Sequence, residues 1–234
     1  MDTRKVKLIV LSDFLCPWCY VGYRELQTAI SQCATLPITF ELEYRPFILH
    51  PGLTDEGIDK HEYLMRKFGK AKTDCIMQMA KTRGEAAGIN FSFSGIVSQS
   101  TRAHRLVMKA MAVGGSSAQQ ALLRLIFKAY MEEEQDIADI DNLSEMAECA
   151  GVMSKKEAAE FLKGVECLAE VEQQVTEARA KGVTGVPFTI IDGKWAVSGG
   201  QTADVFVKIF KKLAQTPDSS PSHSEAPIAV PTAA

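Results

Sequence analysis

Two cysteines separated by two residues are the strongest chemical signal in this chain of 234 residues. The motif Cys16-Pro17-Trp18-Cys19 follows an apolar run at residues 6–11, which predicts a strand, and it opens a stretch that predicts a helix. The first backbone N–H groups of a helix lack partners, and together with the helix dipole they stabilise a negative charge. A thiolate is therefore favoured here, and the two thiols are placed for reversible disulfide chemistry.

The predicted helix gives the two thiols different positions. Pro17 suits the first helical position, where its missing N–H costs nothing. Residues of one helical face recur at steps of four, three, four and three: Cys19, Tyr23, Leu26, Ile30 and Cys33. Cys19 is therefore expected to point towards the core, and Cys16 to lie at the open N-terminal end. This asymmetry favours Cys16 as the attacking nucleophile and Cys19 as the buried resolving thiol.

Zinc binding and a chance pair of core cysteines are the alternatives to redox chemistry. A zinc site needs a second close pair of Cys or His ligands. The remaining cysteines are scattered along the chain: Cys33, Cys75, Cys149 and Cys167. No metal site is therefore expected, and these four thiols are expected to be structural. Cysteine is common in protein cores. However, the spacing of Cys16 and Cys19 and their position at a strand-to-helix turn favour a redox pair.

The composition is that of an ordinary globular protein, with 46% hydrophobic residues, a formal net charge of −3 and a pI near 5.9. The sequence contains no stripe of basic residues of the kind that would indicate a nucleic-acid partner. The N-terminal apolar run is too short for a signal peptide, and no segment is long enough to span a membrane. We therefore expect a cytoplasmic protein, whose thiols stay reduced unless they cycle during catalysis.

Hydrophobic periodicity predicts a β-α-β opening followed by a long helical region. Residues 6–13 and 38–47 read as strands, and residues 17–32 read as the helix between them. From residue 57 to residue 181 the pattern is helical. This long segment carries several apolar stripes, which are best explained as packing faces of a helical module.

Strand character returns near the end of the chain, at residues 186–191 and 195–198, before a last helix. The fold class is therefore α/β, with one discontinuous domain formed by residues 1–56 and 182–214. A large all-helical insertion at residues 57–181 interrupts it, and the Pro-, Ser- and Ala-rich tail at residues 215–234 is predicted to be disordered.

The segment Gly185-Val186-Pro187 is the second informative motif. Proline cannot donate to a sheet ladder, so at the start of a strand it marks an edge, a turn or a cis peptide bond. A Val-Pro step that enters a late strand, combined with an earlier Cys-x-x-Cys, resembles the thioredoxin superfamily. In that superfamily the cis-proline faces the disulfide, and the preceding residue offers its backbone to an extended substrate.

Within that superfamily the chain resembles the DsbA-like group, particularly the FrnE-type proteins. The segments that carry the resemblance lie at residues 12–19, 45–47, 100–105, 185–187 and 197–201. The resemblance implies a thioredoxin fold with a helical insertion and dithiol–disulfide oxidoreductase activity. Two related groups, the 2-hydroxychromene-2-carboxylate isomerases and the kappa-class glutathione transferases, typically have Ser in place of the first cysteine and lack the second.

We therefore predict a thiol–disulfide oxidoreductase in which Cys16 and Cys19 are catalytic. The residues predicted to bind substrate are Pro17, Trp18, Val186 and Pro187. One alternative is a glutathione-dependent isomerase or transferase of a small aromatic or polyketide-like molecule, which would use Cys16 alone. Another is a thiol-dependent chaperone or binding module.

The predicted partner is a protein or small molecule that carries a disulfide or a thiol. Glutathione or a thioredoxin-type reductant is the candidate electron donor. No cofactor is expected, although glutathione is a candidate co-substrate.

Asp13 and His104 are titratable residues for which the sequence leaves two roles open. Asp13 stands at the end of the first predicted strand, where it suits either a proton acceptor for Cys19 or a cap at the helix entry. His104 lies between Arg102 and Arg105. We expect it to belong to a structural polar cluster rather than to act as a catalytic base.

Overall fold

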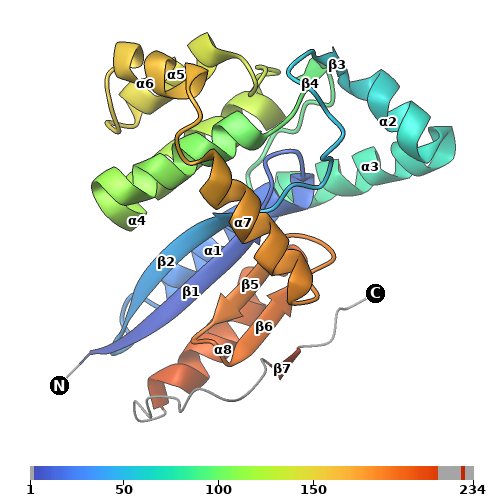
Figure 1. The fold of residues 1–234 in the computed structure, drawn as a ribbon. Coiled ribbons are helices and arrows are strands. Elements are labelled where there is room, and N and C mark those ends of the chain that lie inside the picture. Colours follow the sequence, from blue (N-terminus) through green and yellow to red (C-terminus); the bar gives the residue numbers. More distant parts are fainter. Residues whose placement is uncertain (1–2, 216–227, 230–234) are drawn as a thin grey trace.

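A five-stranded mixed sheet is the centre of the fold (Figure 1) in the computed structural model, which describes residues 3–215 and 228–229. Its strands are β1 (Arg4–Ser12), β2 (Ile38–Pro46), β5 (Phe188–Ile191), β6 (Trp195–Ser198) and β7 (Ile228–Ala229), in the order β2-β1-β5-β6-β7. β1 runs parallel to β2 and antiparallel to β5, which pairs antiparallel with β6. An apolar run predicted β1, alternating residues predicted β2, and β-rich runs on both sides of a turn signal predicted β5 and β6. No such pattern predicted β7, which pairs parallel with β6, and most of the tail predicted as disordered lies outside the described residues.

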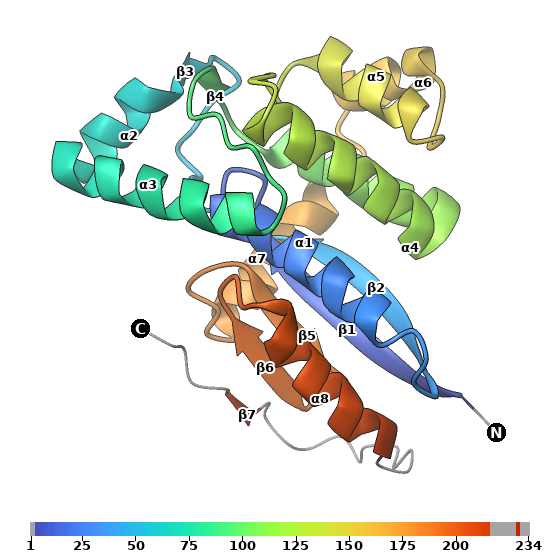
Figure 2. The ribbon, with the colours of Figure 1, turned by 180° about the vertical axis from the view of Figure 1, so that it is seen from behind.

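Helices cover both faces of this sheet. α1 (Pro17–Gln32) and α8 (Ala203–Gln215) pack side by side on one face, which Figure 2 shows from the front. α7 (Leu168–Ala180) crosses the other face, in front of the strands in Figure 1. A β-α-β unit and a later β-β-α unit sharing one sheet form the predicted thioredoxin fold.

The segment between β2 and α7 is mainly helical and lies at the end of the sheet where α1 begins (Figure 1). Its elements are β3 (Ile58–Asp59), α2 (Lys60–Phe68), α3 (Lys70–Ala86), β4 (Ile96–Val97), α4 (Thr101–Met131), α5 (Ile140–Cys149) and α6 (Lys155–Lys163). The sequence predicted an all-helical insertion, but β3 and β4 form a short antiparallel pair. Two-residue strands are too short to produce an alternating pattern, so periodicity could not predict them.

A continuous apolar core joins the insertion to the sheet and α1. Phe127 of α4 is fully buried, and its ring lies 5.0 Å from that of Phe14 and 5.1 Å from that of Tyr20, centroid to centroid. The amide of Gln119 also covers the outer edge of β2, because it accepts from Tyr44 N at 2.7 Å and donates to Tyr44 O at 2.9 Å. The insertion is thus packed tightly onto the sheet.

A second, smaller apolar cluster lies under α7 and joins this helix to the sheet: Leu11, Phe47, Ala178 and Val183. α7 is the last helix of the predicted insertion, yet it covers one face of the thioredoxin-like part. The division of the chain at residues 57 and 181 stays a prediction.

Candidate active site

Cys16 is the N-cap residue of α1 and has an extended backbone, with φ −95° and ψ 113°. Pro17 occupies the first turn, as predicted, and no described side chain caps this helix end. The first turn continues with Trp18 and Cys19, neither of which is acidic. The Cys16 sulfur therefore lies at the positive end of the helix dipole, with no acidic side chain in that turn.

Cys19 lies in the first turn of α1, beneath Cys16, and is 2% exposed. Its Sγ accepts a hydrogen bond from the N–H of Asp13 at 3.5 Å. Burial, followed by the neighbouring Cys16 thiol, raises the pKa of Cys19 well above its ordinary value. Both cysteines are free thiols in this structure. The predicted core-facing position of Cys19 is observed, and it suits a thiol that reacts only with its neighbour.

Cys16 was expected to lie open at the helix end, but it is only 5% exposed. Its Sγ donates to the carbonyl oxygen of Val186 at 3.5 Å. The two residues are 170 positions apart in the chain, so the local helix pattern could not predict that Val186 shields the Cys16 thiol from solvent. The structure therefore brings the two sequence motifs together at one site.

The Val186–Pro187 peptide bond is cis, as predicted, and Pro187 is buried. Two glycines allow the surrounding segments to approach closely. A Cβ on Gly22 of α1 would lie 3.1 Å from Pro187 Cγ, and a Cβ on Gly200 would lie 3.0 Å from the carbonyl oxygen of Trp18. Sequence reasoning missed the role of Gly22, although its small size inside an otherwise larger-residue helix was a possible signal.

Arg83 of α3 connects the insertion to this site and was not predicted to do so. Its Nη2 donates to the carbonyl oxygen of Gly200 at 3.0 Å and lies 3.8 Å from Glu25 Oε1. Glu25 in turn accepts from the N–H of Ala203 at 2.8 Å. The insertion thus holds the loop that packs against Trp18.

The Asp13 side chain is fully buried and does not bond to Cys19. Its Oδ1 accepts from the N–H of Leu15 at 3.2 Å, and its Oδ2 accepts from the N–H of Leu49 at 2.7 Å. His104 Nε2 lies 3.5 Å from Oδ1. Two roles were left open for Asp13. These contacts favour a role in ordering the chain at the entry to α1, whereas no direct contact between the carboxylate and a thiol supports the role of proton acceptor.

The predicted cluster of His104 with its two neighbouring arginines does not form. Arg102 pairs with Asp55 at 2.6 Å and donates to Ala138 O at 2.8 Å. Arg105 donates to four backbone carbonyls at and after the end of α6: Phe161, Leu162, Gly164 and Glu166. Side chains at adjacent helical positions point in different directions, so each of the three residues meets a different partner.

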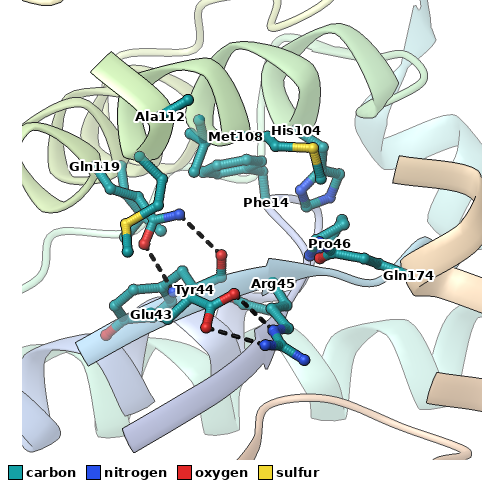
Figure 3. Close-up of a pocket in the computed structure, with 14 residues that line it drawn as sticks. Phe14, Glu43, Tyr44, Arg45, Pro46, His104, Met108, Ala112, Gln119 and Gln174 are labelled. Carbon is teal, nitrogen blue, oxygen red and sulfur yellow. Dashed lines mark hydrogen bonds and ion pairs between the residues drawn. The ribbon is translucent and has the colours of Figure 1, made fainter. Parts of the chain in front are cut away.

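A pocket of about 230 Å³ lies between α4 and β2, beside the redox pair rather than above it. Figure 3 shows His104 and Met108 reaching from α4 towards the strand that carries Arg45 and Pro46. Phe14, which follows Asp13 in the chain, also lines this pocket.

Within residues 3–215 and 228–229, no three His, Cys, Asp or Glu side chains are grouped to hold a metal ion. Nor does any helix of that part of the chain combine the length and apolarity needed to cross a bilayer.

Comparison with solved structures supports the fold assignment. A probable DsbA oxidoreductase from Streptomyces coelicolor, SCO1869, superposes with a TM-score of 0.80 at 25% identity, covering 94% of each chain. A 2-hydroxychromene-2-carboxylate isomerase gives a TM-score of 0.67 at 15% identity, covering 89% of this chain and 96% of its own. The cytosolic disulfide reductase DsbM from Pseudomonas aeruginosa, in a structure with GSH, gives 0.61 at 17% identity, covering 90% of this chain and 100% of its own.

The family comparison covers most of the chain. A family model described as a DSBA-like thioredoxin domain matches residues 7–211. This range includes Cys16, Cys19 and the cis-Pro187 loop, together with the complete insertion. The chain therefore belongs to the family of DSBA-like thioredoxin domains.

Proposed function

We propose that this protein is a thiol–disulfide oxidoreductase of the FrnE type, with Cys16 and Cys19 as its redox pair. The observation that carries the proposal is the position of Cys16 Sγ, at the N-cap of α1 and 3.5 Å from the carbonyl oxygen of Val186. Cys19 lies directly beneath it and is buried. A reactive thiol, a resolving thiol and a backbone acceptor thus meet at one point.

The proposed reaction begins when the Cys16 thiolate attacks one sulfur of a substrate disulfide. A Cys16–substrate bond forms, the substrate S–S bond breaks, and the released sulfur takes up a proton. Cys19 then loses its proton to solvent, and its thiolate attacks Cys16 Sγ. The Cys16–Cys19 bond forms and the substrate leaves as a second thiol. The substrate has gained two electrons, and the enzyme dithiol has lost them.

The carbonyl oxygen of Val186 connects deprotonation to substrate binding. It accepts from Cys16 only while that sulfur carries a proton. Once Cys16 is a thiolate, the carbonyl is free to accept an N–H from an extended substrate, in the manner of strand addition. Pro17, Trp18, Val186 and Pro187 are the residues we expect to contact that substrate.

We expect the substrate to be a protein or small molecule with a disulfide or thiol, and glutathione or a thioredoxin-type protein to restore the dithiol. Similarity to a cytosolic disulfide reductase in a structure with GSH supports glutathione as a co-substrate and a cytoplasmic location. In that reducing compartment the pair rests mainly as a dithiol. We expect the helical insertion at residues 57–181 to select the substrate.

Reduction of a protein disulfide, such as that of insulin, by Cys16→Ser and Cys19→Ser variants tests the proposal. We expect C16S to be inactive, and C19S to accumulate a covalent mixed disulfide with the substrate, visible by mass spectrometry. An isomerase or transferase that uses glutathione with Cys16 alone would keep its activity in C19S. A thiol-dependent chaperone or binding module would hold unfolded chains but reduce no disulfide, in the unaltered protein as in the variants.

A further inference from the structure

Asp13 contacts both redox cysteines through its backbone. Its N–H donates to Cys19 Sγ at 3.5 Å, and its carbonyl oxygen accepts from the N–H of Cys16 at 3.2 Å. A donor at this distance stabilises the Cys19 thiolate more than the thiol. The position of this one residue therefore bears on how readily Cys19 becomes the attacking group.

The Asp13 side chain is fully buried. It is held by Leu15, Leu49 and His104, which lie in three separate parts of the fold. Leu15 N and Leu49 N donate to its two oxygens, at 3.2 Å and 2.7 Å. The third neighbour of this carboxylate is His104 of α4, whose Nε2 lies 3.5 Å from Oδ1. Burial raises the pKa of Asp13, but the contacts with His104 and Leu49 outweigh it, so the pKa lies below its ordinary value.

His104 is itself fixed by the insertion. It is 5% exposed and belongs to α4, and its ring packs on Phe14 with centroids 5.0 Å apart. Figure 3 shows it beside Phe14 at the wall of the pocket between α4 and β2. Because Phe14 also packs on Phe127 of α4, the imidazole cannot move without moving this part of the core.

We propose that His104 is a positioning residue for the redox pair and that it acts on Cys19 through Asp13. This inference rests on the proposed function. Without the imidazole, the buried carboxylate would lose the polar neighbour 3.5 Å from Oδ1, and a buried charge that lacks such partners is strongly unfavourable. It would take up a proton or move towards water. In either case the N–H of Asp13 would shift relative to Cys19 Sγ, and the resolving step would slow while attack by Cys16 would not.

The matched variants are His104→Asn and His104→Gln. The amide nitrogen of Gln can occupy the place of His Nε2, which faces Asp13, whereas that of Asn corresponds to Nδ1 and falls short. Met108→Leu is the control, because Met108 lines the same pocket from α4 and is not among the residues paired with the Asp13 side chain. All variants are made in a background in which Cys75, Cys149 and Cys167 are replaced by Ser, since these thiols are exposed or half-buried.

The two thiol steps are separated with an excess of an aromatic disulfide that releases a coloured thiolate at each step. The first release reports attack by Cys16, and the second reports attack by Cys19. We expect H104N to slow the second release about tenfold, about the cost of removing one polar partner from a buried charged group, with the first release unchanged. H104Q should stay within about threefold of the unaltered protein, and M108L should match it.

An Asp13→Asn background provides the final check. If His104 acts through Asp13, H104N should have little further effect in the D13N protein, because the two changes remove one interaction. A second release in H104N as fast as in the unaltered protein, equal slowing of both releases, or an additive double variant would overturn the inference. Absence of any second release from the unaltered protein would instead refute the proposed function itself.

Discussion

Replacement of Phe127 by Ala should destabilise the thioredoxin-like part and the helical insertion together. Phe127 belongs to α4 of the insertion and is 0% exposed. Its ring lies 5.0 Å from that of Phe14, 5.1 Å from that of Tyr20 and 6.2 Å from that of Tyr23, centroid to centroid. Three aromatic residues at or before α1 thus lose a shared partner, and a cavity forms between the two parts.

The expected cost is about 4 kcal/mol, within the range of about 3–5 kcal/mol for a buried Phe→Ala change. The aromatic contacts place it above the lower end of that range. For a chain of this size, about 2–4 °C is lost per kcal/mol, so the melting temperature should fall by about 8–16 °C. Val113→Ala, on the same helix but 57% exposed, should change stability by no more than about 0.5 kcal/mol.

Urea unfolding followed by two signals tests the shared core. The chain has two tryptophans, Trp18 and Trp195, and both lie outside the insertion, so fluorescence reports the thioredoxin-like part. Far-ultraviolet circular dichroism reports helix content, most of which lies in the insertion. We expect both midpoints to fall together in F127A. A shift confined to circular dichroism would show that the two parts unfold independently, and would refute the reasoning.

Three further outcomes follow from the structure. Iodoacetamide should modify Cys16 before Cys19, because burial raises the pKa of Cys19; faster labelling of Cys19, mapped by mass spectrometry, would reverse their roles. Burial lowers the pKa of Lys60 to about 8, so the folded state binds fewer protons than the unfolded chain between about pH 8 and pH 10. Its contribution to stability should rise by about 2 kcal/mol across that window, and urea titrations should show no such rise in Lys60→Met relative to the unaltered protein. Arg83→Ala should cost at most about 1 kcal/mol, because the side chain is partly exposed, yet it should raise the KM for a protein disulfide by loosening the Gly200 loop; an unchanged KM would separate Arg83 from substrate binding.

The elements that could be predicted from sequence are those whose pattern is local. The step pattern from Cys19 predicted α1, and β-rich runs bounded by turn residues predicted β5 and β6. Val186–Pro187 was predicted as cis because it entered a strand of a fold already indicated by the Cys-x-x-Cys motif, and the structure confirms it.

What sequence reasoning missed depends on approach between distant segments. The resemblance predicted that Val186–Pro187 faces the redox pair, but not that Val186 covers Cys16, 170 residues earlier. Nor was it predicted that the carboxylate of Asp13 meets His104 of α4. The contact of Arg83 with Gly200 joins segments that no period connects. The contacts of His104 and Arg83 depend on how the insertion packs on the rest of the chain, which a local sequence pattern does not predict.

Redox titration of the Cys16–Cys19 pair is the measurement that tests the central claim most directly. The protein is equilibrated in glutathione buffers of graded potential and quenched with acid, and its Cys16–Cys19 disulfide is quantified by peptide mass mapping. We predict a reversible two-electron transition with a midpoint between about −270 and −120 mV, the span of known dithiol oxidoreductases. Failure of the folded protein to form this disulfide anywhere in that range would contradict the assignment of Cys16 and Cys19 as a redox pair.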